Sequence, residues 1–147
     1  MRAVIQRVQR ASVDVDGQPV AVTGPGLCVL VGVETGDTER DAEWMADRLL
    51  KLRIFNDAHG KPNLGVTDTG GSILLVSQFT LLGDATGGRR PSYTAAARPE
   101  QAEPLFDRVV ELCRNSGTVC GTGRFGAQMT VEIINDGPFT ILLDSRK

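Results

Sequence analysis

The tetrapeptide Ser77-Gln78-Phe79-Thr80 is the part of this chain best suited to chemistry. It closes an apolar run, and the pattern predicts a single β-strand over residues 72–80. Because successive strand side chains point to opposite faces, Ser77 and Phe79 are expected on one face, and Gln78 and Thr80 on the other. Hydroxyl and amide groups buried where a strand ends need hydrogen-bond partners. They therefore either cap the strand and bond to nearby loops, or form one wall of a polar pocket.

A second candidate is the segment Asn135-Asp136-Gly137-Pro138, which lies between two apolar stretches at 129–134 and 139–143. Asparagine, aspartate, glycine and proline are all typical of tight turns. Residue types alone predict a hairpin turn joining two strands. They also favour a trans Gly-Pro bond, since only about 5–6% of X-Pro bonds in folded proteins are cis.

Conventional catalytic groups are scarce. The single histidine, His59, lies in a loop of turn-forming residues over 56–63, where a solvated side chain is more common than a catalytic one. The chain has no Gly-x-Ser-x-Gly elbow. Cys28, Cys113 and Cys120 lack Cys-x-x-Cys spacing and are interpreted as buried structural thiols, with nothing nearby to lower a thiol pKa. We therefore expect neither a disulfide framework nor a metal site.

Residues 121–126, Gly-Thr-Gly-Arg-Phe-Gly, match the spacing of a dinucleotide-binding loop. Such a loop follows a strand and opens a helix, so that the phosphate meets the helix N-terminus. Here the residues that follow alternate with the period of a strand. The segment is therefore interpreted as a glycine-rich turn.

The charge balance and the low aromatic content disfavour a dedicated nucleic-acid-binding module. The chain has 16 Lys and Arg against 18 Asp and Glu, and aromatic residues make up 5%. Contact with a polyanion would then have to come from a local patch. Arg89 and Arg90, together with Lys51, Arg53 and Arg124, are the candidates for such a patch, and scattered solvated side chains are the equally supported alternative.

The 147 residues are enough for one domain, and no linker or repeat divides them. Apolar residues at three- and four-residue steps predict helices over about 38–53 and 99–115. Strands are predicted over 3–15, 20–22, 27–33, 72–80, 129–134 and 139–143. The fold class is therefore a mixed α/β single domain over residues 1–147, with about seven strands in β layers covered by two main helices.

Several properties bear on location and assembly. No stretch has the apolar length of a membrane span, and charged residues interrupt the first segment too early for a signal peptide. We expect no membrane contact and a cytoplasmic location. The apolar strands are many for a chain with two helices, so exposed sheet surface favours association.

Taken together, the motifs resemble the D-aminoacyl-tRNA deacylase family, whose members remove D-amino acids from tRNA. The resemblance covers essentially the whole chain, and it is most specific where Ser-Gln-Phe-Thr is followed about sixty residues later by Asn-x-Gly-Pro-x-Thr. The other matching stretches are 1–8, 11–13, 90–92 and 122–127.

The resemblance implies a homodimer with active sites at the subunit interface, acting on the aminoacyl end of the tRNA acceptor stem. Ser77 to Thr80 would be the catalytic wall. Gly137 and Pro138, joined by a cis bond, would reach into the partner's pocket to bind the substrate and reject L-aminoacyl groups. Arg7 would hold this element in place, and Asn135 would support it. Phe139 stands where many relatives have valine, and no role is carried over to 87–89.

The implied reaction needs no cofactor and no metal. The chain offers no visible histidine–carboxylate pair as a base, and the family is thought to use the 2′-hydroxyl of the terminal ribose, with the protein supplying backbone amides. D-aminoacyl-tRNA and glycyl-tRNA are the expected substrates. Two alternatives stay open: an esterase with Thr80 as nucleophile, which needs an adjacent base, and a non-catalytic RNA-binding module.

Overall fold

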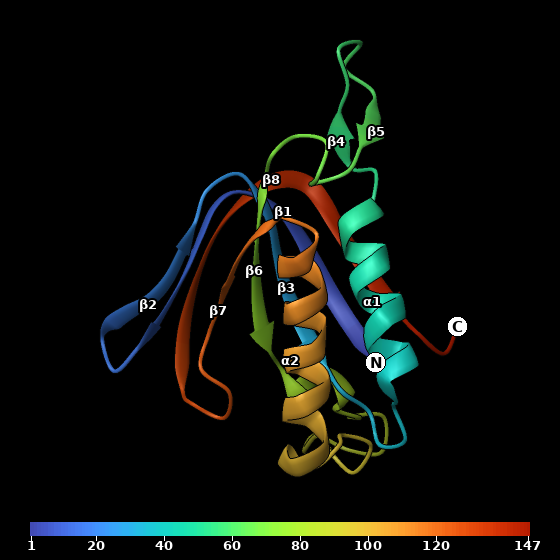
Figure 1. Ribbon diagram of the computed structural model, residues 1–147. Helices are drawn as coiled ribbons and strands as arrows, with labels where there is room; N and C mark the ends of the chain where they lie inside the picture. Colours follow the sequence, from blue (N-terminus) through green and yellow to red (C-terminus); the bar gives the residue numbers. More distant parts are fainter.

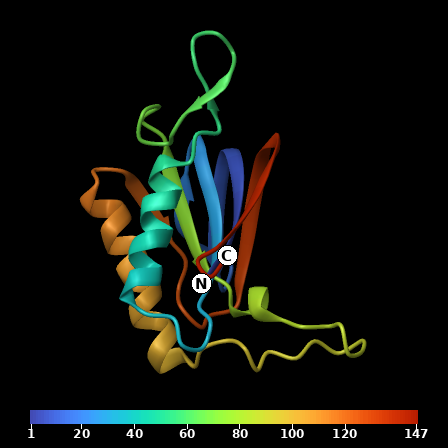
Figure 2. The same ribbon diagram turned by 90° about the vertical axis from the view of Figure 1, so that its right-hand side faces the viewer.

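Two helices lie side by side across one face of a strongly curved sheet (Figure 1, Figure 2). The computed structural model describes every residue from Met1 to Lys147. The helices are α1, Glu39–Lys51, and α2, Pro99–Asn115, and a short 3-10 turn, η1, spans Phe79–Leu82 directly after the strand β6. The strands are β1 Arg2–Val15, β2 Gln18–Thr23, β3 Gly26–Gly32, β4 Phe55–Asn56, β5 Pro62–Leu64, β6 Ser72–Ser77, β7 Val119–Thr122 and β8 Met129–Asp144.

The long strand β1 organises the main sheet, whose order is β2-β1-β3-β6-β7, with β8 on the free side of β1. β1 is antiparallel to β2, β3 and β8, whereas β3, β6 and β7 run parallel. The parallel strands have their carboxyl ends at one end of the molecule, which is where a ligand site is commonly built in such sheets.

Both faces of the sheet carry buried apolar side chains. The larger cluster packs the inner faces of α1 and α2 against the sheet, with Ile5, Val29 and Leu75 among its members. A smaller cluster lies on the opposite face and includes Cys28 and Val76. Because both faces of the sheet are buried, the side chains of β3 and β6 are apolar at nearly every position.

The predicted helices are confirmed to within two residues. Thr38 precedes α1 as its N-cap, and its backbone N–H donates to the Asp41 carboxylate at 2.8 Å. Pro104 lies inside α2 rather than ending it. Neither helix is long and apolar enough to cross a membrane.

The strand predictions need several corrections. The structure has eight strands, six of them in a single main sheet and two in the small β4–β5 hairpin, which was predicted as loop. β7 was not predicted at all. The two strands predicted at 129–134 and 139–143 are one strand, because both halves of β8 pair with β1 over its whole length. The segment 135–138 is thus an irregularity within β8, not a hairpin turn.

The strand predicted over 72–80 ends at Ser77, and Phe79 and Thr80 belong to η1. The predicted alternation of their faces is therefore wrong. The turn is possible because η1 packs directly on Gly32 of β3: a Cβ added there would lie 2.6 Å from Leu82 Cδ2 and 2.9 Å from the Gln78 carbonyl oxygen. The missing side chain of Gly32 makes room for the turn.

Candidate functional site

A cavity of about 540 Å³ opens where β6 ends, between the start of α2 and the turn that leads into β8. Ser77, Gln78 and Phe79 form one side of it. Residues 96–99 and 125–127 line the other sides, and Met129 and Val131 of β8 close the floor. Most of this lining is apolar, which suits a site that excludes water from a few polar groups.

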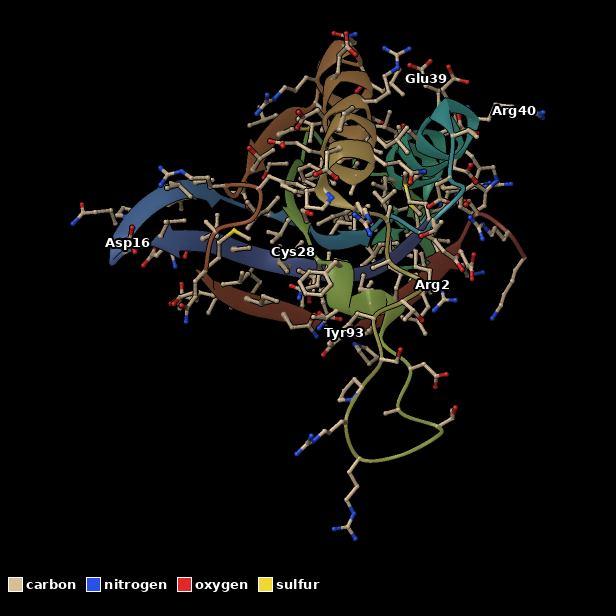
Figure 3. The ribbon with its side chains drawn as sticks, turned by 90° about the horizontal axis from the view of Figure 1, so that it is seen from below. Arg2, Asp16, Cys28, Glu39, Arg40 and Tyr93 are labelled. Carbon is tan, nitrogen blue, oxygen red and sulfur yellow. The ribbon has the colours of Figure 1, made fainter.

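The polar wall of this cavity is internally bonded. The Gln78 side-chain amide donates a hydrogen bond to the Thr80 hydroxyl. The Phe79 ring is half exposed and meets the Tyr93 ring edge-on, with centroids 5.2 Å apart. Figure 3 views this end of the molecule and shows Tyr93 at the base of a projecting loop. Ser77, Gln78 and Phe79 thus line the cavity together with Tyr93, which the sequence did not indicate, whereas Thr80 lies outside the lining and is bonded to Gln78.

Titratable groups are nearly absent from the cavity. Of the residues that line it, only Tyr93 and Arg98 carry an ionisable side chain, and neither is a carboxylate or an imidazole. His59 lies in the β4–β5 hairpin at the opposite end of the molecule (Figure 1). No cluster of three or more His, Cys, Asp or Glu side chains is placed to hold a metal ion. The cavity therefore offers positioning and hydrogen bonding, not acid–base chemistry.

Arg7 anchors the second signature segment to the sheet. Its buried guanidinium pairs with the Asp136 carboxylate at 3.0 Å and donates to the Asp136 carbonyl oxygen at 3.2 Å. It also donates to the Ile54 carbonyl oxygen at 2.6 Å and stacks on the Phe139 ring at 4.1 Å. These contacts fix the backbone on both sides of Gly137 and Pro138, which are themselves exposed. The bond between those two residues is cis, which confirms the expectation from the resemblance and corrects the one from residue types.

Replacing Arg7 by methionine is expected to destabilise the protein by about 2–3 kcal/mol, because it leaves buried acceptors without their charged donor. Urea unfolding at a fixed protein concentration measures the loss. Arg10→Met in the same strand is the matched control, since both side chains of its pair with Glu132 are about half exposed. The control should lose no more than about 1 kcal/mol. Equal losses in the two variants would contradict a special role for Arg7.

The cavity and the Gly137–Pro138 segment lie apart within one chain. Ser77 pairs with Val31 of β3, whereas Arg7 pairs with Leu27, four residues nearer the start of that strand. Met129 and Val131 of β8 line the cavity, but Gly137 lies six residues beyond Val131 in that strand, about 20 Å in extended chain. Neither Gly137 nor Pro138 lines the cavity. A single chain therefore does not unite the two signature segments.

The predicted basic patch is not assembled as expected. Lys51 pairs with Asp47, and Arg53 donates to the carbonyl oxygen of Asn63 at 2.9 Å. Both lie by the β4–β5 hairpin, at the opposite end of the molecule from the cavity (Figure 1). Arg124 precedes the cavity residue Phe125, and Arg98 lines the cavity itself.

The cysteines follow the prediction in part. Burial raises the pKa of Cys28 to about 11, as expected of a structural thiol. A hydrogen bond with Cys120 raises the pKa of Cys113 and lowers that of Cys120. The expectation that nothing lowers a thiol pKa is therefore wrong for Cys120, because the fold places two cysteines from α2 and β7 side by side.

Comparison with known proteins decides the family. The family model for D-Tyr-tRNA(Tyr) deacylase matches residues 4–144. A D-aminoacyl-tRNA deacylase from Dehalococcoides mccartyi is 56% identical over 146 residues, covering 99% of this chain and 95% of the relative. A D-aminoacyl-tRNA deacylase from Kosmotoga olearia is 55% identical over 147 residues, which is 100% of this chain and 99% of the relative. This chain belongs to the D-aminoacyl-tRNA deacylase family.

Solved structures agree on the fold of this deacylase family member. A chain described as a c-Myc DNA unwinding element binding protein matches with a TM-score of 0.92 and 42% identity, covering 98% of each chain. A probable eukaryotic D-amino acid tRNA deacylase matches with a TM-score of 0.82 over 97% of each chain. At 18% identity the second likeness shows the fold alone. The curved sheet with two helices is thus shared across distant sequences.

Proposed function

We propose that this chain hydrolyses the ester bond of D-aminoacyl-tRNA and releases free tRNA and the D-amino acid. Its family membership supports the substrate class. The observation that carries the reaction chemistry is the cavity beside Ser77 to Thr80, which holds polar positioning groups and no carboxylate or imidazole. A site whose lining lacks a side-chain base can use one that its substrate supplies.

We assign the role of the base to the 2′-hydroxyl of the terminal ribose, which is adjacent to the ester. It orients a water molecule whose oxygen attacks the ester carbonyl carbon, and the bond from that carbon to the 3′ oxygen breaks. The water proton passes through the 2′-hydroxyl to the departing 3′ oxygen, so no proton is left on the protein. Because the cavity holds the water and the ester in the orientation for attack, a bimolecular step becomes an effectively unimolecular one.

Backbone N–H groups at the start of η1 are suited to stabilise the developing oxyanion. The first N–H groups of a helical turn have no partner inside the turn, and those of Phe79 and Thr80 begin η1 beside the cavity. Removing one such donor from an oxyanion site costs about 10²–10³ in rate in other hydrolases. We assign Ser77 and Gln78 to positioning of the ribose and of Thr80.

Chirality is enforced by Gly137 and Pro138 of a second copy of this chain. Gly137 has no side chain and Pro138 has no N–H, so this segment presents mainly rigid backbone and carbonyl oxygens. Carbonyl oxygens accept from the substrate α-amino group, and the backbone leaves no room for an L side chain. D side chains point away to solvent and are tolerated broadly. Glycine has no side chain to exclude, so glycyl-tRNA is a substrate as well.

Thr80 as a nucleophile is the second candidate mechanism, and the geometry disfavours it. The hydroxyl of Thr80 accepts a hydrogen bond from the Gln78 amide, which cannot take up a proton. No titratable group bonds to Thr80. A serine- or threonine-type nucleophile needs such a base within hydrogen-bond reach.

A deacylation assay tests the proposed function. Purified protein is incubated with D- and L-aminoacyl-tRNA carrying the same amino acid, and acid-precipitable radioactivity is followed with time. We expect loss of the D ester and of glycyl-tRNA, and no loss of the L ester above the spontaneous rate. Binding without hydrolysis of the D ester would indicate an RNA-binding module, and equal hydrolysis of both esters would contradict the chiral filter.

Complementation between two inactive variants tests the shared site. A wall variant, Gln78→Ala, and a filter variant, Gly137→Val, are co-expressed with different tags, and the mixed dimer is isolated by tandem purification. In a mixed dimer one site carries both changes and the other carries neither, so roughly half of the wild-type activity should return. Sites contained within one chain would give no recovery.

A further inference from the structure

Most arginines of this protein are engaged in contacts within the chain, and four of the five exposed ones that are not lie at the end of the molecule where the cavity opens or on the loop that projects from it. Arg2, Arg7, Arg10, Arg108 and Arg146 are in salt bridges. Arg53 and Arg114 donate to backbone carbonyl oxygens, and Arg48 stacks on Trp44. Only Arg40 and four others lack any such contact.

Those four are Arg89, Arg90, Arg98 and Arg124, which we call the arginine rim. All four are exposed, and none donates a side-chain hydrogen bond or pairs with a carboxylate. Arg98 lines the cavity, and Arg124 precedes the cavity residues 125–127. Arg89 and Arg90 belong to the loop that leaves η1 and returns at Tyr93. Three separate segments thus bring free guanidinium groups to the same end of the molecule.

The loop that carries Arg89 and Arg90 has an ordered base. Asp84 and Ser92 exchange two backbone hydrogen bonds of 2.8 Å, which closes the loop. The Asp84 carboxylate accepts from the N–H and hydroxyl of Thr86 at 2.9 and 2.7 Å, and these bonds lower its pKa. Beyond this base the loop projects away from the body of the protein (Figure 2, Figure 3).

The tip of the loop forms a polar hollow of about 490 Å³ with no apolar residue in its lining. Its lining consists of Arg89 and Arg90, Gly87 and Gly88, and the two base residues Asp84 and Ser92. Four residues separate the loop base from its tip, a reach of about 13 Å in extended chain.

We propose that the arginine rim binds the phosphates of the RNA strand that enters the cavity, so that the 3′ end of the tRNA is held by its backbone. This inference rests on the proposed function, because it takes the cavity as the site of the terminal aminoacyl-adenosine. Guanidinium groups bind phosphate bidentately, and contacts of this kind position a nucleic acid without reading its sequence. The nearby carboxylates, Asp84 and Glu100, do not outnumber the four cations.

This assignment reconciles a near-neutral protein with a polyanionic substrate. The formal net charge of the chain is −2, so long-range attraction to RNA is absent. The unpaired arginines of the rim supply the attraction locally, at the end of the molecule where the cavity opens and on the loop that projects from it. The protein then binds the acceptor end and has little affinity for other stretches of RNA.

The test compares full-length D-aminoacyl-tRNA with D-aminoacyl-adenosine, which contains the ester and the ribose but no phosphate. The variant is Arg89→Gln with Arg90→Gln. The matched control is Arg40→Gln with Lys61→Gln, two exposed cations without ionic partners elsewhere on the surface. For the rim variant, kcat/KM on the tRNA should fall about tenfold further than kcat/KM on the adenosine ester. The slope of log(kcat/KM) against log salt should flatten by about 1.4, since each lost phosphate contact on a single strand contributes about 0.7.

The outcomes separate this inference from the proposed function. If the wild-type protein hydrolyses neither ester, the proposed function fails. If the wild-type protein is active and the rim and control variants change equally on both esters, the rim is not a phosphate site. A drop that is the same on tRNA and on the adenosine ester likewise overturns the inference, because it reports damage to the cavity and not lost backbone contact.

Discussion

A D-aminoacyl-tRNA whose terminal adenosine lacks the 2′-hydroxyl is expected to be hydrolysed about 10³-fold more slowly than the natural ester, within the range of a lost general base. The reason is that the cavity offers no carboxylate or imidazole to replace the hydroxyl. Single-turnover rates with excess protein isolate the chemical step from binding. The spontaneous hydrolysis of both esters is measured in buffer and subtracted.

Thr80→Ala provides the complementary measurement. This change removes the hydroxyl of Thr80, the residue weighed above as a nucleophile, and leaves the backbone N–H groups of η1 in place. If the ribose hydroxyl supplies the catalytic function, the variant keeps its rate within about tenfold. A loss of about 10³ with an unchanged circular dichroism spectrum, together with full activity on the 2′-deoxy ester, would instead establish Thr80 as the nucleophile.

Periodicity in the sequence predicted the helices well and the strand connections poorly. The apolar spacing of α1 and α2 reflects burial of one face, so Ala42, Met45 and Leu49 mark the helix whatever it packs against. The apolar pattern of a strand does not indicate which other strand it pairs with. The two apolar stretches of β8 read as separate strands because turn-forming residues divide them. Pairing with β1 on both sides of residues 135–138 keeps them in one strand.

The end of β6 shows a different limit. The apolar run gives way to mostly polar residues at Ser77 to Thr80, but nothing local indicates that the strand stops at Ser77 and not at Thr80. The stop depends on Gly32 in β3, which lies 45 positions earlier in the chain and leaves room for η1. A contact of this kind between distant residues is not visible in local composition.

The candidate site was predicted by motif, and its geometry was not. Arg7 was expected near Gly137 and Pro138 through the resemblance alone, and the structure shows how it is held, by Asp136, Ile54 and Phe139. Tyr93 and Arg98 gave no sequence signal, because a single aromatic residue or arginine in a loop is usually solvated. Their positions follow from the path of the chain between η1 and α2.

Gly137→Ala is expected to lower kcat/KM for D-aminoacyl-tRNA about a hundredfold, comparable to a misplacement of about 1 Å at a reacting centre. Within the chain the added Cβ would meet only the end of the exposed Asn135 side chain, at 3.1 Å, and that side chain can shift. The fold should therefore be unaffected. In the shared site the methyl group would project toward the α-carbon of the substrate.

The substrate series makes this prediction specific. Because the methyl group occupies space that every aminoacyl group needs, activity on glycyl-tRNA should fall along with that on the D ester, and the L ester should stay intact. Gly24→Ala is the control, since a Cβ added there meets nothing within 4 Å. Thermal unfolding of both variants should match the wild type within about 0.5 kcal/mol, as is usual for surface changes. Unchanged D activity in a stable Gly137→Ala protein, or hydrolysis of the L ester by it, would show that exclusion by the backbone at Gly137 is not how this site selects its substrates.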